Sequence, residues 1–495
     1  EDAMNVAMGL DSLKTTHPID VKVNSPSEIR EIFDAISYDK GGCVLRMLEH
    51  YVGEPNFQKG LKEYLKKFKY KNAKGQDLWD AIGKASKMPV SVMVNSWLKQ
   101  PGFPLIEIKQ DGNHLYLTQK RYLLEPNKNA SKGSWVIPFS IGLGDFTISK
   151  LFSKKSLSIK IPKSIGFVAN TGRKGFYRVK YDEGILLDLK MLVDQKQIPS
   201  IDRWAIQNDL YSLCVSGHEN VRNYLDFSDA YFGEDSYLAS INVAHNLTSL
   251  YFRAFDEKFS AEIKEYVINY LRKILSDLGW EPRTFDKHTD ALLRSFAISS
   301  LGKMDDEQVS IEAQKRYQRF LKSPSTLSPD LIEPICSIAA WNGNSKTYSE
   351  LVKLYKNAKT MEEKLRFLGA MCGFKDTNLL KKTLDFSQTS EVRSQNMQLP
   401  IMRVASNPYG KEILWPWLKK NWKKLNKKVG HGNPLFNRIV ASISSVADDS
   451  MEKEIKNFFK KNPTPGTERT QAQTLERIRI NSKFLRRMRK EFQNG

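Results

Sequence analysis

The chain has 495 residues, of which 40% are hydrophobic and 27% are charged, a composition typical of a globular protein of about two to four domains. It contains no run of about 18 apolar residues, which excludes a membrane-spanning helix from the expected elements. The net charge of +21 would suit nucleic acid, an acidic membrane face or acidic peptides. The basic residues are spread along the chain without a compact nucleic-acid motif, so we expect a lysine-rich solvated surface and no nucleic-acid partner.

The four cysteines, Cys43, Cys214, Cys336 and Cys372, stand far apart and form no CxxC pair. Their spacing therefore suggests neither a cysteine zinc site nor a redox motif. So few cysteines in a long chain favour a reducing compartment, and we expect a cytoplasmic protein. The first residues lack both a methionine at position 1 and a signal-peptide pattern, and they fall inside a helical pattern, so we expect the amino end to be a cut.

The first segment, residues 1–101, has the apolar spacing of helices. Apolar side chains recur at helical intervals in residues 29–36 and again in residues 44–51. The glycine pair at 41–42 lies between these stretches, and glycine allows a sharp turn and a close approach. The pattern therefore predicts that Tyr38 lies at a corner between two helices, with room beside it for a ligand.

From residue 105 the apolar period changes to two, which is typical of strands. Six short strands are expected, separated by turns rich in Gly, Asn or Pro: residues 105–108, 114–124, 135–141, 146–152, 157–161 and 176–181. Closely spaced short strands favour a small β-sandwich, here over residues 102–184. No acid–base cluster accompanies these strands, so we expect a spacer domain.

Residues 185–495 return to helices of ordinary length joined by short polar links. No strict sequence repeat is visible. Paired antiparallel helices stacked into a curved, HEAT/armadillo-like array are the expected layout, and such arrays present a concave face.

The stretch from Phe33 to Gly41 reads Phe-Asp-Ala-Ile-Ser-Tyr-Asp-Lys-Gly. It resembles the FDxxSYxKG segment of the aminopeptidase N-like family of zinc metallo-aminopeptidases, which are gluzincins. Other stretches are similar to the same family, in the family's order: residues 10–13, 16–19, 119–121, 135–138, 175–181, 407–425 and 474–481. The Tyr38 segment is most similar to that of the antigen-trimming aminopeptidases of the endoplasmic reticulum and of the archaeal tricorn-interacting factors.

This resemblance implies a multidomain, mainly α fold with a small β-sandwich. Residues 1–101 would be the helical remainder of a thermolysin-like catalytic domain, residues 102–184 the β-sandwich, and residues 185–495 a helical domain that encloses the substrate. The resemblance also implies that Tyr38 donates a hydrogen bond to the oxyanion of the tetrahedral intermediate, and a preorganised donor of this kind lowers the barrier. The alternative for Tyr38 is a half-buried core aromatic residue with a hydrogen-bonded hydroxyl.

The family binds zinc through an HExxH motif and a distant glutamate, and a GxMEN motif holds the substrate's free amine. Neither motif occurs here, and none of the seven histidines is followed four residues later by another. We therefore expect no metal ligand in this chain. The zinc, its ligands, the base and the amine anchor would belong to a missing N-terminal catalytic segment. His17, near the Tyr38 segment, is expected to order the loop before Pro18.

Arg30 is a candidate substrate-binding residue. It precedes Tyr38 by about two helical turns, which would place both on roughly the same side of a helix. The antigen-trimming relatives carry an arginine at this position, near the pocket for the residue after the cut. The alternative is a solvated arginine on a helix surface.

Three functions remain open at this point. The first is the C-terminal part of a zinc-dependent aminopeptidase that removes N-terminal residues from peptides and is inactive without its missing segment. The second is a catalytically inactive remnant that binds peptides or a protein. The third is a basic scaffold for nucleic acid. The sequence indicates no oligomeric state.

Overall fold

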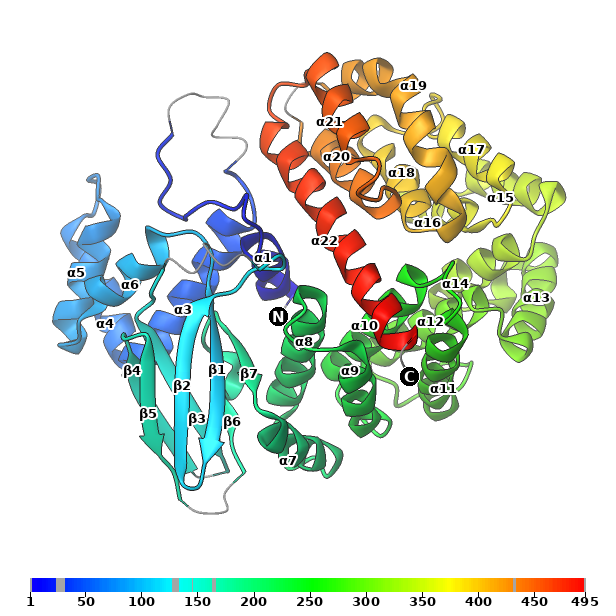
Figure 1. Cartoon of the computed structure of the whole chain (residues 1–495). Helices are drawn as coiled ribbons and strands as arrows, with labels where there is room; N and C mark the ends of the chain where they lie inside the picture. Colours follow the sequence, from blue (N-terminus) through cyan, green and yellow to red (C-terminus); the bar gives the residue numbers. More distant parts are fainter. Residues whose placement is uncertain are drawn as a thin grey trace. The chain divides into compact units, whose positions relative to one another are not determined.

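The computed structural model describes residues 2–23, 32–126, 133–144, 146–162, 166–430 and 433–493. The chain divides into two compact units, Glu1–Glu234 and Asp235–Gly495. The expected mainly helical architecture with a small β region is confirmed (Figure 1). The finer division at residues 101 and 184 and the HEAT/armadillo-like array stay predictions.

The first unit opens with helices whose apolar sides are buried. They are α1 (Asp2–Asp11), the π-helical turn η1 (Ile36–Lys40), α3 (Gly41–Val52), α4 (Glu54–Lys67), α5 (Gly75–Ser86) and α6 (Val90–Leu98). Trp97 on α6 is fully buried; its Nε1 donates to the carbonyl oxygen of Val136 over 3.0 Å, and its ring lies 6.2 Å from that of Trp135. This contact joins the helices to the region of the strands.

The strands form two small sheets. They are β1 (Pro104–Asp111), β2 (His114–Arg121), β3 (Ile137–Leu143), β4 (Phe146–Phe152), β5 (Ser156–Lys160), β6 (Val168–Ala169) and β7 (Arg178–Tyr181). One sheet has the order β5-β2-β1-β7, with β1 and β7 parallel, and the other has the order β4-β3-β6 (Figure 1). The backbone N–H of Ala169 donates to the Tyr181 hydroxyl over 3.0 Å and links the sheets. The six expected strands are confirmed, with ends shifted by a few residues. The two-residue β6 was missed because it is too short to show a period.

In the described part of this unit, the strands are followed by the α-helices α7 (Glu183–Asp194), α8 (Ser200–Ser216) and α9 (Val221–Ser228). Asp209 on α8 is buried and binds Arg173 through two hydrogen bonds of 2.7 and 2.8 Å and Arg178 through one of 2.7 Å. The same carboxylate accepts the backbone N–H of Val179 over 3.0 Å. One carboxylate therefore fastens α8 to the end of the β region, which sequence reasoning did not foresee.

The second unit is helical throughout its described residues. Its helices are α10 (Tyr237–Arg253), α11 (Ser260–Leu278), α12 (His288–Lys303), α13 (Glu307–Lys322), α14 (Pro329–Trp341), α15 (Ser345–Asn357), α16 (Met361–Ala370), α17 (Thr377–Phe386), α18 (Gln398–Ala405), α19 (Lys411–Val429), α20 (Pro434–Val446), α21 (Glu452–Lys461) and α22 (Glu468–Gln493), with the short 3₁₀ turn η5 (Met371–Gly373) after α16. Most contacts join helices that are one or two apart along the chain. Among the described residues, no helix has the length and apolar character needed to span a membrane.

Candidate active site

Tyr38 lies in η1, and its side chain is 54% exposed. Its ring meets that of Phe33 edge to face, with 4.6 Å between the ring centroids. Within the described residues the Tyr38 hydroxyl has no hydrogen-bond partner, so the phenol is not the half-buried core aromatic of the alternative interpretation. A single π-helical turn is often associated with a functional site.

The expected corner at the glycine pair is wrong. Gly41 has helical dihedral angles, φ −54° and ψ −49°, and η1 runs directly into α3. Glycine permits a turn but does not impose one. Among the described residues, a Cβ atom added at Gly41 or Gly42 would meet no atom within 4 Å. The room expected beside Tyr38 for a ligand stays a prediction. Of the helix expected at 29–36, residues 32–35 are not helical and residues 29–31 lie outside the described residues.

A side chain fixes the start of the Tyr38 turn. Asp34 Oδ1 accepts the backbone N–H groups of Ile36 and Ser37 over 2.9 and 3.2 Å. Such local side-chain capping competes with a helix that would otherwise continue through this point, so the helical turn begins after Asp34. The other carboxylate oxygen, Oδ2, lies 2.9 Å from His17 Nε2.

His17 is buried and holds two segments together. Its Nδ1 lies 2.8 Å from the carbonyl oxygen of Pro18, and its Nε2 contacts the Asp34 carboxylate. Both partners accept hydrogen bonds, so both contacts are satisfied when each ring nitrogen carries a proton. The expected role of His17 in ordering the loop at Pro18 is confirmed. Both ring nitrogens are occupied by these contacts, which leaves neither for a metal.

A buried ion pair fixes the other end of the turn. Lys40 and Asp11 are both 0% exposed, and Lys40 Nζ lies 2.9 Å from Asp11 Oδ2. Lys40 also donates to the carbonyl oxygen of Gly102 over 3.0 Å, while Asp11 Oδ1 accepts the Gly102 N–H and the Thr16 hydroxyl over 2.9 Å each. Burial lowers the pKa of the Lys40 ammonium, and the Asp11 charge opposes that shift.

Gly102 is the one glycine of this site whose lack of a side chain matters. Its φ is +87°, and a Cβ atom there would collide with the side chain of Arg121. Glycine alone therefore lets the backbone between α6 and β1 reach both Lys40 and Asp11. Two anchors, one on each side of Tyr38, thus connect the turn to α1, to the Pro18 loop and to the start of β1.

Sequence reasoning missed this role for Asp34, Lys40 and Asp11. Asp34 and Lys40 stand inside the FDxxSYxKG pattern, and Asp11 stands in the stretch that precedes it. A charged residue inside an otherwise matching pattern was the available signal. Arg30, the candidate substrate-binding residue, lies outside the described residues.

The zinc implied by the family does not fit this part of the protein. Among the described residues, no group of three or more His, Cys, Asp or Glu side chains is placed to hold a metal ion. All four cysteines are free thiols. Burial raises the pKa of the Cys372 thiol to about 12, which disfavours its thiolate at neutral pH.

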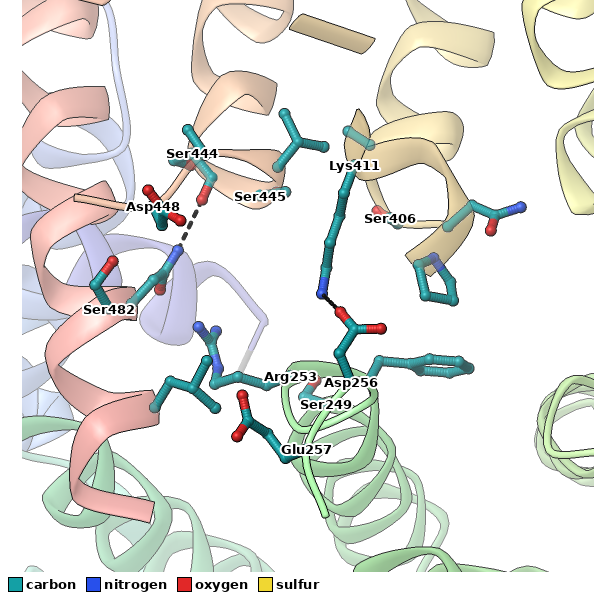
Figure 2. A pocket seen from close by; sticks show the side chains of 18 of the residues that line it. Ser249, Arg253, Asp256, Glu257, Ser406, Lys411, Ser444, Ser445, Asp448 and Ser482 are labelled. Atoms are coloured by element: carbon teal, nitrogen blue, oxygen red, sulfur yellow. Dashed lines mark hydrogen bonds and ion pairs between the residues drawn. The ribbon is translucent and has the colours of Figure 1, made fainter. Parts of the chain in front are cut away.

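A separate cavity of about 560 Å³ lies within the second unit, beside α10, α20, α22 and the start of α19 (Figure 2). Two of its cations are paired inside it: Lys411 with Asp256 over 2.7 Å, and Arg489 with Glu257 through two bonds of 2.6 and 2.8 Å. These four groups therefore neutralise one another and form a polar wall.

Comparison with known proteins covers nearly the whole chain. The family model described as "ERAP1-like C-terminal domain" matches residues 167–480, and the one described as "Peptidase family M1 domain" matches residues 1–97. Aminopeptidase M1-B of Oryza sativa subsp. japonica and Aminopeptidase M1 of Arabidopsis thaliana are each 30% identical to the chain, over 99% of the chain and 58% of the relative. "Aminopeptidase 2, mitochondrial" of Saccharomyces cerevisiae is also 30% identical, over 99% of the chain and 52% of the relative.

The chain thus spans a little over half the length of the curated relatives it matches. The M1 peptidase model matches the beginning of the chain, and the ERAP1-like model matches most of the helical part that follows. From these matches, the chain belongs to the aminopeptidase N-like family of M1 peptidases.

Proposed function

We propose that this chain is the C-terminal part of a zinc-dependent aminopeptidase that removes N-terminal residues from peptides, and that Tyr38 is its oxyanion-stabilising residue. The observation that carries the proposal is the exposed phenol of Tyr38 on a turn fixed at both ends by buried partners. The helical second unit would restrict which peptides reach the site. The free thiols suit the reducing, cytoplasmic location we propose.

Tyr38 acts in this proposal as a hydrogen-bond donor. When a nucleophile attacks the first peptide bond, the carbonyl oxygen becomes an oxyanion, and the phenol O–H donates to it. A donor contributes most when it needs no reorganisation as the charge develops. The contacts of Asp34 with His17 and of Lys40 with Asp11 support this role, because they hold the backbone on both sides of the tyrosine.

The metal belongs to another segment in this proposal. The described residues offer no ligand set, and the 495-residue sequence contains no HExxH motif. We therefore assign zinc, its ligands and the general base to a segment outside this sequence. The chain alone is expected to be inactive toward aminoacyl anilides, and chelator-sensitive release of the anilide by purified chain alone would contradict this assignment.

The direct test is Tyr38→Phe in the protein that joins this chain to its metal-binding segment. Loss of one oxyanion donor lowers kcat by about 100- to 1000-fold. KM should change little, because the hydrogen bond forms mainly in the transition state. A phosphinic peptide, which imitates the tetrahedral intermediate, should lose affinity by a similar factor.

Tyr116→Phe is the matched control, because Tyr116 is 50% exposed and lies on β2 away from the turn. Its kcat should equal that of the wild type. An unchanged kcat in Tyr38→Phe would remove the role proposed for Tyr38.

Arg30 enters the proposal as a residue that favours acidic or polar side chains after the cut. Its replacement by alanine should reduce kcat/KM for such peptides more than for peptides with an apolar residue there. Equal kcat/KM ratios in the wild type and in Arg30→Ala would exclude this role.

A further inference from the structure

A second cavity in the helical unit has an unusual charge. It has a volume of about 220 Å³ and lies among α12, α14, α16, η5 and α18. Its wall includes two cationic side chains, Lys303 and Arg403, together with Trp341, Cys372 and Asn407. It shares the segment 406–408 with the larger cavity of Figure 2, where Lys411 and Arg489 are paired with carboxylates.

Lys303 is the last residue of α12, and within the described part of the chain its ammonium makes no hydrogen bond and no ion pair. Burial lowers the pKa of this ammonium, the Arg403 charge lowers it further, and the Glu333 charge acts in the opposite direction. Lys303 is partly buried on the cavity wall, and its ammonium carries three donors with which it can hold an anion.

Arg403 on α18 is held beside the cavity by an ion pair with Glu333 on α14. Its guanidinium lies against Gly369, where a Cβ atom would collide with it. The contact with Glu333 uses one of five guanidinium N–H donors.

The other polar groups of this wall supply no counter-charge. Asn407 donates its side-chain N–H groups to the carbonyl oxygens of Cys372 and Phe374, over 2.9 Å each. Cys372 remains a neutral thiol, because burial raises its pKa to about 12. Two cations thus face one carboxylate, and one positive charge is left uncompensated.

We propose that this cavity binds a small oxyanion, such as phosphate or a dicarboxylate, between Lys303 and Arg403. The volume supports a small free ion, because it lies below the roughly 300 Å³ at which cavities for drug-sized ligands begin. Charge-assisted hydrogen bonds from an ammonium and a guanidinium are the usual means of holding such groups. This inference goes beyond the proposed peptidase activity and does not depend on it.

The test measures binding to the purified chain. Inorganic phosphate and malonate are titrated separately by calorimetry, in chloride buffer of constant ionic strength. Lys303→Met should weaken binding of the preferred anion by about tenfold or more, because a hydrogen bond to a charged group is lost. Lys303→Arg should retain most of the affinity, since it keeps the charge. The two anions distinguish a phosphate site from a carboxylate site.

Lys411→Met is the matched control, because it removes one lysine from the adjoining cavity. Its affinity should equal that of the wild type. A thermal-shift series at the same concentrations separates specific binding from general salt effects, which act on all variants alike. No binding of either anion to the wild type, or equal affinity in the wild type and in Lys303→Met, would overturn the proposal.

Discussion

Burial lowers the pKa of both Lys40 in the first unit and Lys303 in the second, although Lys40 is fully buried and Lys303 is only partly buried. They differ in their partners. Lys40 binds a carboxylate and a carbonyl oxygen, whereas Lys303 faces a cavity without a protein partner among the described residues. A charge that the protein pairs works as an anchor, and one that it leaves without a partner is suited to bind a ligand.

The largest effect on stability is expected for the variant Lys40→Met. It leaves the Asp11 carboxylate buried without its ion-pair partner, and breaking such a pair costs about 3–5 kcal/mol. The urea midpoint of unfolding should therefore fall. The double variant Lys40→Met with Asp11→Leu should recover most of the loss, because an apolar pair needs no counter-charge. A single variant as stable as the wild type would show that the pair is not an anchor.

A smaller effect is expected for Asp34→Ala, which removes the acceptor for Ile36 and Ser37 and leaves His17 without its carboxylate. Loss of such a partly buried, charged acceptor costs about 1–3 kcal/mol. Hydrogen exchange at the Ile36 and Ser37 amides should accelerate. In the complete enzyme kcat should fall while KM changes little.

Asp39→Ala is the control for that variant, because Asp39 lies on the same turn and has no side-chain hydrogen bond within the described residues. Asp34→Asn should restore amide protection, since an amide oxygen still caps the turn. If Asp34→Ala and Asp39→Ala lower kcat equally, Asp34 does not position Tyr38.

Lys303→Met should change the free energy of unfolding in the opposite direction to Lys40→Met. It replaces an uncompensated charge by an apolar chain of similar length, so in chloride buffer the free energy of unfolding should rise by up to about 1 kcal/mol. Urea unfolding at pH 7 measures the difference. A loss comparable to that in Lys40→Met would show that the ammonium has a protein partner after all.

The smallest effect is expected in how pH changes the difference in unfolding free energy between the wild type and Lys303→Met. The pKa of Lys303 is lower in the folded chain than its usual 10.5, so the unfolded chain binds more protons as the pH rises toward that value. The stability of the wild type should therefore rise relative to Lys303→Met between neutral pH and pH 10. The charged groups that act on Lys303 are Arg403 and Glu333. A constant difference would mean that Lys303 titrates as an exposed lysine does.

The spacing of apolar residues predicted the strands and helices, because these depend mainly on residues close together in the sequence. The strands of residues 105–181 were found because alternation of apolar residues marks a half-buried strand whatever lies beside it. The helical character of most of the chain was found in the same way. The turn expected at Gly41 does not form, because glycine makes a turn possible without requiring it.

For this protein, the sequence by itself determined the mainly helical class, the β region, the family and the candidacy of Tyr38. Only the tertiary structure decided that Lys40 is paired and Lys303 is not. The physical reason is distance along the chain: Asp11 and Gly102 reach Lys40 from separate elements, as Arg403 and Cys372 reach the Lys303 cavity from others. A lysine's sequence neighbours do not reveal whether folding will bring it a carboxylate or an empty space.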